Sequence, residues 1–199
     1  MASFRRALEE QRWDDHRYYH HSRVNQSLHL VSAIAFLCTY VLLFAAPVAA
    51  ALVGWLVAMV ARQVGHFFFE PKGYDAVNQA THEHKEAVKV GYNLRRKVVL
   101  LSIWALVPVA IWAARMFGEG AAAFDRERFL DDVARGWLVL AVAAVLFRML
   151  QLFVTKDVQT GVVWVVKILT DSFHDIKLYH RSPLHLLRGE LLDPGAARH

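Results

Sequence analysis

Between Leu28 and Ala61 lie 34 consecutive residues without a formal charge, and few folds can accommodate such a stretch. As one straight helix it would be about 50 Å long, whereas the hydrocarbon core of a bilayer is roughly 30 Å thick. Pro47 lies near its middle. The stretch therefore predicts two membrane helices, over about residues 28–46 and 48–69, joined by a tight turn near Pro47.

Two more apolar blocks, about residues 98–114 and 136–154, are long enough to cross a membrane. The first contains Pro108, which membrane helices tolerate better than soluble ones. The second contains Arg148, which we expect to snorkel to the interface or to face the bundle interior. Four transmembrane helices are therefore predicted.

The segments that follow the second and fourth blocks are expected to lie at the membrane surface. Residues 75–97 are rich in His, Glu and Lys and predict a surface helix. The apolar run 158–169 is broken by Lys167 and is too short to span, so it predicts an interfacial or packed amphipathic helix followed by a polar, surface-bound tail. The predicted fold is an all-α polytopic membrane helical bundle, with interfacial amphipathic helices, in a single domain over residues 1–199.

The composition supports a membrane protein and excludes two other classes. Apolar residues make up 56% and charged residues 21% of the chain, whereas a soluble domain is about 45–50% apolar. The net charge of +5 comes from basic residues that flank the apolar blocks, so no nucleic-acid partner is expected. Cys38 is the only cysteine, which rules out a disulfide within the chain and a thiolate metal site.

Lysine and arginine residues gather in three segments, 1–27, 70–97 and 155–199, and the turn near Pro47 has none. The positive-inside rule then predicts that both termini are cytoplasmic, in the inner membrane of a bacterium. The loop over residues 115–135 holds four arginines and runs against this rule.

Eleven histidines are present, and none lies in the middle of an apolar block. If the topology holds, they gather at one face of the membrane. His21, Asn25 and His29 share one stripe of a helix, and His66 and Glu70 share another. Imidazole and carboxylate ligands at such spacings suit iron, zinc or manganese. The predicted metal ligands are His20, His21, His29, His66, His82, His84, His174 and His180.

Three acidic residues, Glu83, Asp171 and Asp175, are candidates for further ligands or for partners that fix the imidazole tautomers. The simpler interpretation of any single histidine here, such as His16, is an anchor at the lipid headgroups. His66 fits that interpretation least, because a polar residue at lipid depth is a functional hypothesis by default.

Two short segments resemble a known family. The first is Tyr19-His20, four residues, Asn25, three residues and His29; the second is Gly65-His66, three residues and Glu70. Over about residues 18–71 the chain is similar to the membrane-embedded 2-hydroxy-fatty-acid dioxygenases. The resemblance implies an iron(II)-dependent oxygenase, Fe(2+) being the cofactor, that uses dioxygen to shorten a 2-hydroxy fatty acid by one carbon in α-oxidation. The catalytic residues would be His20, Asn25 and Glu70.

A lipid substrate would leave its acyl chain between the helices and present its polar head at the interface, beside the histidines. Arg62, Arg95 or Arg96 would then pair with the carboxylate, an expectation that rests on location alone. Residues 81–97 and the tail lie outside the family pattern.

Two alternatives remain open from the sequence. A di-iron lipid hydroxylase or desaturase also uses histidines at a membrane face, but its H-x-x-H-H and H-x-x-x-H boxes are absent here. A non-enzymatic membrane scaffold predicts that His29→Ala or His66→Ala leaves function intact. The oligomeric state and the role of the tail are open as well.

Overall fold

The computed structural model describes residues 3–118, 120 and 124–197, and all their regular secondary structure is helical. This confirms the all-α prediction. The helices are α1 (Phe4–Tyr19), α2 (Arg23–Ala45), α3 (Pro47–Leu52), η1 (Val53–Met59), α4 (Val60–Val64), η2 (Gly65–Phe69), α5 (His82–Val88), α6 (Leu94–Gly118), α7 (Arg126–Thr155), α8 (Val158–Tyr179), α9 (Ser182–Leu187) and η4 (Pro194–Ala197).

Four helices among the described residues are long and apolar enough to cross a membrane, which confirms the four predicted spans. The second span is the continuous run α3–η1–α4–η2, in which η1 and η2 are π-helical turns. It is separated from α2 by Ala46, whose backbone is not helical, and Pro47 then opens the new helix. The fourth span begins at Arg126 rather than near residue 136, because the Asp125 side chain accepts hydrogen bonds from the backbone N–H groups of Glu127 and Arg128.

The second, third and fourth spans are joined by a stack of three tryptophans. Trp104 stacks between Trp55 and Trp137, with ring centroids 5.8 and 5.4 Å apart. Trp55 Nε1 donates to the backbone oxygen of Trp137, and Trp137 Nε1 donates to that of Trp104, each at 3.0 Å. Trp55 is thus a packing residue that joins the second span to the fourth.

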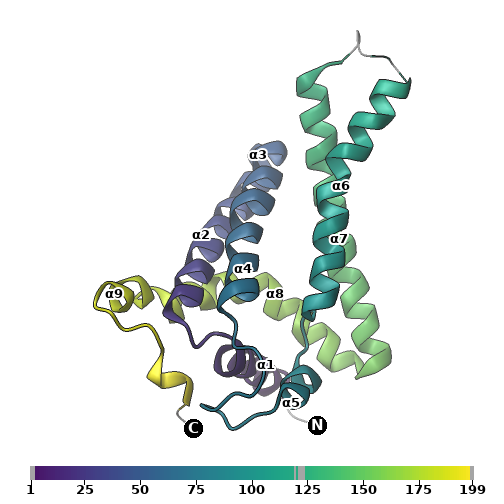
Figure 1. Ribbon diagram of the computed structural model, residues 1–199. Coiled ribbons are helices and arrows are strands. Elements are labelled where there is room, and N and C mark those ends of the chain that lie inside the picture. The colour runs from purple at the N-terminus through teal and green to yellow at the C-terminus, as the bar shows by residue number, and fades with distance from the viewer. Residues whose placement is uncertain (1–2, 119, 121–123, 198–199) are drawn as a thin grey trace.

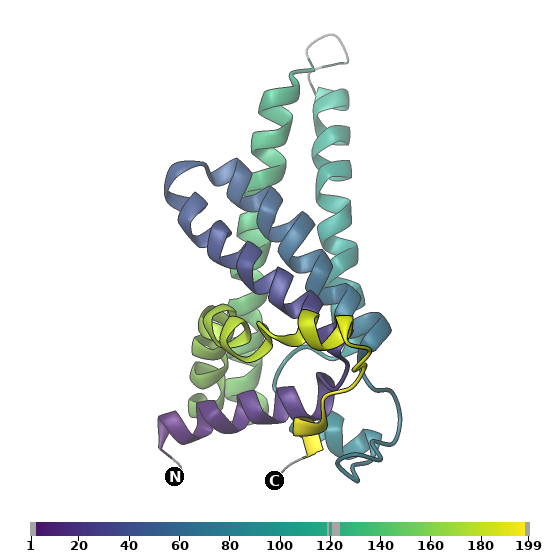
Figure 2. The ribbon, with the colours of Figure 1, turned by 90° about the vertical axis from the view of Figure 1, so that its left-hand side faces the viewer.

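The spans run in a common direction, and the amphipathic helices lie across one end of them (Figure 1). In both views α1 and α8 lie beneath the hairpin formed by the first two spans (Figures 1 and 2). The first and last described residues lie at this end, and the C-terminal end of α6 and the N-terminal end of α7 lie at the other. Both described chain ends are therefore on one side of the bundle, and which compartment that side faces stays a prediction.

Helix α8 begins where the interfacial helix was predicted but continues to Tyr179. The prediction of a polar, surface-bound tail is wrong for its first part, because Asp171, Ser172 and Asp175 are buried. They are buried because basic side chains of α1, the second span and α8 itself meet them there. The tail therefore packs against the bundle.

The prediction of one helix over residues 75–97 is also wrong, since only α5 is helical between Pro71 and Leu94. The Asp75 carboxylate instead accepts hydrogen bonds from the N–H groups of Val77 and Asn78, which folds a turn. Asn78 Nδ2 donates to the backbone oxygen of Arg17 at 2.7 Å and holds that turn on α1.

Arg148 faces the bundle interior, which was one of its two predicted positions. Its guanidinium donates to the backbone oxygen of Val90 at 2.9 and 2.7 Å and to that of Gly91 at 3.1 Å. These bonds hold the linker between α5 and α6 against α7.

We predict that α1 and the start of α7 lie on opposite sides of the membrane. In a Cys38→Ala background, Glu10→Cys should react with a membrane-impermeant maleimide only after cell lysis, whereas Arg126→Cys should react in intact cells. Both positions are exposed, so access to the reagent decides the labelling. His185→Cys is the control and should behave like Glu10→Cys. Equal labelling of positions 10 and 126 in intact cells would contradict this topology.

Candidate metal centre

The loop between α1 and α2 carries His20. The Asn25 and Gln26 side chains each donate back across it at 2.8 Å, to the backbone oxygens of Tyr19 and His20 respectively. Asn25 and Gln26 are fully buried, so both bonds are sheltered from water. The loop is thereby folded over the first turns of α2, which brings His20 next to His29.

His66 approaches the same place from the second span, in the π-turn η2. A β-carbon on the preceding residue, Gly65, would collide with Asn25 Oδ1 and come within 3.4 Å of His29 Cδ2. Only glycine lets the two spans approach this closely. A π-turn also shifts the side chains that follow it around the helix, and such turns are frequent at functional sites.

Three imidazoles meet where these elements converge. His20, His29 and His66 each offer a ring nitrogen, and the three nitrogens lie within 4.8 Å of one another. The Nε2 atoms of His20 and His29 are 3.1 Å apart, and the ring centroid of His66 is 4.9 Å from that of His29. It is the sole group of three or more metal-ligating side chains that close together in the described part of the chain. We call it the imidazole cluster.

The cluster fits a first-row divalent metal ion. Neighbouring nitrogens bonded to one ion at ~2.1 Å lie roughly 3 Å apart, which is the observed spacing of His20 and His29. The Nε2 atoms are therefore the ones placed to bind a common ion, while the Nδ1 atoms of both rings are buried without a hydrogen-bond partner. Imidazole is a ligand for iron, zinc, copper and nickel alike, so the donor set alone selects none of them.

Carboxylates stand behind two of the three rings. Glu70 Oε2 lies 2.8 Å from His66 Nδ1, so that nitrogen carries the proton and Nε2 is left as the ligand atom. Asp175 Oδ2 faces His29 Nδ1 at 3.7 Å and is held by Arg62 Nη2 at 2.6 Å. Glu70 thus positions a ligand rather than binding in the cluster.

Burial, followed by the neighbouring His29, lowers the pKa of His20 well below its usual value of 6.5. The imidazole is therefore neutral at pH 7, the form that binds metal. Burial raises the pKa of Asp15, but Lys167, whose Nζ is 2.8 Å away, outweighs this and holds the pKa below its usual value. Asp15 remains an anion near the cluster.

The other predicted ligands do not reach the cluster. His21 follows His20, but its ring contacts the backbone oxygen of Arg17 and lies 3.5 Å from Asp75. His84 lies 3.3 Å from the hydroxyl of Tyr18. His82 and His180 are exposed and His174 is partly exposed on α8. These five stay predictions without a shared site.

Two of the three acidic residues named from the sequence have other neighbours. Asp171 pairs with Lys167 and Arg12, with N···O distances of 2.5 and 3.3 Å, and Glu83 is exposed. Asp171 and Asp175 are one turn apart on the same helix. Asp175 faces His29 of the cluster, whereas Asp171 faces Arg12 of α1.

A cavity of about 650 Å³ lies between the spans, and His66 of the cluster lines it. Its other lining residues include the polar Arg62 and Asp15 and the apolar Phe36 and Leu138. Of the three arginines expected to bind a carboxylate, Arg62 lines the cavity, whereas Arg95 and Arg96 are exposed and do not line it.

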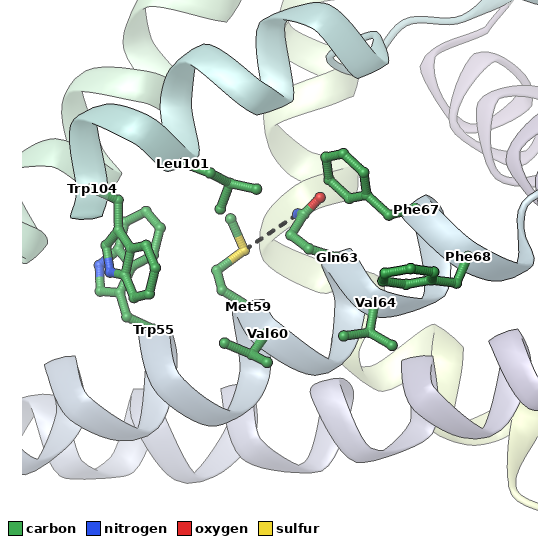
Figure 3. A pocket seen from close by; sticks show the side chains of 9 residues that line it. All are labelled: Trp55, Met59, Val60, Gln63, Val64, Phe67, Phe68, Leu101 and Trp104. Carbon is green, nitrogen blue, oxygen red and sulfur yellow. Dashed lines mark hydrogen bonds between the residues drawn. The ribbon is translucent and has the colours of Figure 1, made fainter. Parts of the chain in front are cut away.

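A smaller apolar pocket of about 200 Å³ adjoins this cavity between the second span and α6 (Figure 3). Trp55, Met59, Gln63 and Leu101 line both spaces. Gln63 Nε2 lies 3.8 Å from the sulfur of Met59 (Figure 3). The polar Gln63 and the flexible Met59 therefore lie side by side where the pocket meets the cavity.

The groups that hold the His20 loop from outside were not predicted from the sequence. Gln26 donates to Asp193 at 2.8 Å and accepts from the Ser182 hydroxyl at 2.6 Å. The backbone N–H of Asp193 donates to the oxygen of His21 at 2.8 Å. The tail therefore covers the loop. Gln26 could have indicated such a contact, because it is a polar residue directly after Asn25 at the start of an apolar helix and needs a polar partner.

We predict that Gly65→Ala lowers the free energy of unfolding by ~1–3 kcal/mol, because the added methyl group displaces Asn25 and separates the first two spans. Unfolding in detergent micelles measures this. Gly118→Ala is the control, since nothing lies within 4 Å of a β-carbon there. Equal free energies of unfolding for the two variants would contradict the close contact between Gly65 and Asn25.

The comparisons with known proteins follow the same residues. Residues 7–79 match the family model described as 2-hydroxy-palmitic acid dioxygenase Mpo1-like. No curated protein and no solved structure matched the chain. The matched segment confirms the resemblance found over residues 18–71 and ends before α5. Over α1, α2 and the second span, which carry all three clustered histidines, the chain is similar to the Mpo1-like 2-hydroxy-palmitic acid dioxygenases.

Proposed function

We propose that the protein is a membrane iron(II)-dependent dioxygenase that shortens a 2-hydroxy fatty acid by one carbon. The observation that carries the proposal is the cluster of His20, His29 and His66, because His66 also lines a largely apolar cavity between the spans. The match of residues 7–79 to the dioxygenase family model supports the same reaction.

The residues of this chain would divide the work between holding an ion and holding a lipid. The imidazole cluster would hold the iron, which when bound supplies electrons and coordination positions for dioxygen and the substrate oxygens. Glu70 keeps His66 in the ligating tautomer. The cavity walls would hold the acyl chain and exclude water from the reacting end.

The same geometry favours one ion over two. Within the described residues the ligand atoms form a single group of three, and His21, His84 and His180 contact other partners. A di-iron hydroxylase would need further ligands beside this group. A scaffold would give no reason to gather three imidazoles from two membrane spans and a loop at one point.

The setting is proposed together with the activity. The protein would be integral to a bacterial inner membrane with both termini cytoplasmic, and it would take its lipid substrate from the bilayer and dioxygen from solution or lipid. The position of both described chain ends on one side of the spans supports this orientation.

We predict that the purified protein contains about one iron per chain and that His29→Ala and His66→Ala lose it. Glu70→Gln should weaken metal affinity by ~10–100-fold, because it removes the carboxylate behind His66 without removing a ligand. Elemental analysis of detergent-purified protein measures the content. His185→Ala, which removes a partly exposed histidine that pairs with Glu190 away from the cluster, is the control. Equal metal content in His66→Ala and the unaltered protein would refute the metal centre.

We predict that the iron-loaded protein converts 2-hydroxyhexadecanoic acid to a product of fifteen carbons when dioxygen is supplied. Mass spectrometry of extracted lipids measures the product. Hexadecanoic acid, which lacks the 2-hydroxyl group, should be returned unchanged, and a chelator should stop the reaction. Recovery of the intact hydroxy acid from protein with a full complement of iron would argue against this activity.

A further inference from the structure

Four cationic side chains line the large cavity, and they differ in what neutralises them. The four are Arg62, Lys89, Lys97 and Lys167. Arg62 pairs with Asp175 at 2.6 Å, and Lys89 pairs with Glu70 at 2.8 Å. Lys167 pairs with two carboxylates, those of Asp15 and Asp171. These three cations are therefore committed to holding the structure around the imidazole cluster.

Lys97 is different. No hydrogen bond or ion pair joins its ammonium group to any residue in the part of the chain that the structure describes. The side chain is partly buried, in the first turn of α6, and lines the same cavity as His66. A charge held in such a place without a counter-ion is unfavourable unless water or a ligand compensates it.

The cavity that Lys97 lines has the composition of a site for an amphiphile. Polar side chains such as Lys97 and His66 line it together with the apolar side chains of Phe36, Leu100 and Leu138. An anion that binds Lys97 would therefore share the cavity with His66, while its hydrocarbon tail lies between the spans.

We propose that Lys97 is the carboxylate-binding residue of this cavity and selects acyl chains with an anionic head over neutral ones. The identity of the reacting substrate rests on the proposed function, but the binding preference does not. The position replaces the three arginines expected from the sequence. Arg62 is already paired with Asp175, and the exposed Arg95 and Arg96 lie outside the cavity.

Two features of the chain make lysine suited to this position. Its long apolar stem can lie along the lipid-facing part of α6 while the ammonium group reaches into the cavity. The residue also lies outside residues 7–79, so the part of the chain that matches the family model supplies the imidazole cluster and α6 supplies the selection of the head group.

The test measures binding, which needs no turnover. Detergent-purified protein is titrated with hexadecanoic acid, 2-hydroxyhexadecanoic acid and hexadecanamide by displacement of a fluorescent fatty acid. The unaltered protein should bind the two acids more tightly than the amide. Lys97→Met should weaken acid binding by ~10–100-fold, the range expected for one charge-assisted hydrogen bond, and should leave amide binding unchanged.

Matched variants separate this role from a structural one. Lys97→Arg, which keeps the charge, should retain the preference for acids, and Lys72→Met, which removes an exposed lysine, should bind as the unaltered protein does. Metal content and thermal midpoint of Lys97→Met should equal those of the unaltered protein. The proposal is overturned if Lys97→Met leaves the ratio of acid affinity to amide affinity unchanged. It is also overturned if Arg95→Met or Arg96→Met, rather than Lys97→Met, abolishes the preference for acids.

Turnover distinguishes this proposal from the proposed function. If the protein shortens hydroxy acids, Lys97→Met should raise KM by a similar ~10–100-fold and change kcat much less. Chain shortening with an unchanged KM in Lys97→Met overturns the role of Lys97 alone. Binding of acids that depends on Lys97, without chain shortening by the iron-loaded protein, supports the role of Lys97 and refutes the proposed oxidation.

Discussion

Asn25 and Gly65 touch where the first and second spans come closest, and the positions of all three clustered imidazoles follow from that contact. Because Gly65 has no side chain, the backbone of the second span lies directly against Asn25, and His66 is brought beside His29. The same asparagine donates to the backbone of the His20 loop, so one side chain connects the three segments that carry the cluster. A larger residue at position 65 would push against Asn25 and so move the two spans, and with them the ligands, apart.

Polar groups at this depth need partners from within the protein, since lipid offers none. The tail supplies several of them. Asp175 on α8 accepts a hydrogen bond from Arg62 of the second span. Asp193 accepts one from Gln26 of the first span, and Ser182 donates one to the same glutamine. A helix that lies across the ends of the spans can reach two of them at once, which a further span could not do. The tail is therefore part of the wall of the site, although it lies outside the segment that matches the family model.

The sequence predicted the cluster better than its surroundings. His20, His29 and His66 were marked by their spacing and by their resemblance to one family pattern, and they meet. Five other histidines were added because they lie on the same membrane face, and they do not reach the cluster. A shared face places residues within the same layer, whereas ligation requires nitrogens within a few ångströms. That difference depends on the direction in which each side chain leaves its helix, and the pattern along the chain does not record it.

Hydropathy by itself determined the four spans, the turn at Pro47 and the segregation of histidines to the polar segments, because uncharged residues must lie in lipid and charged ones must leave it. Only the tertiary structure decided which of the cations that line the cavity lacks an ion pair among the described residues. The sequence alone does not show which of Arg62 and Lys97 is paired. In the structure α8 places a carboxylate beside Arg62 and none beside Lys97. Ion pairing depends on the approach of distant segments, so the charge available to a ligand is a property of the packed bundle.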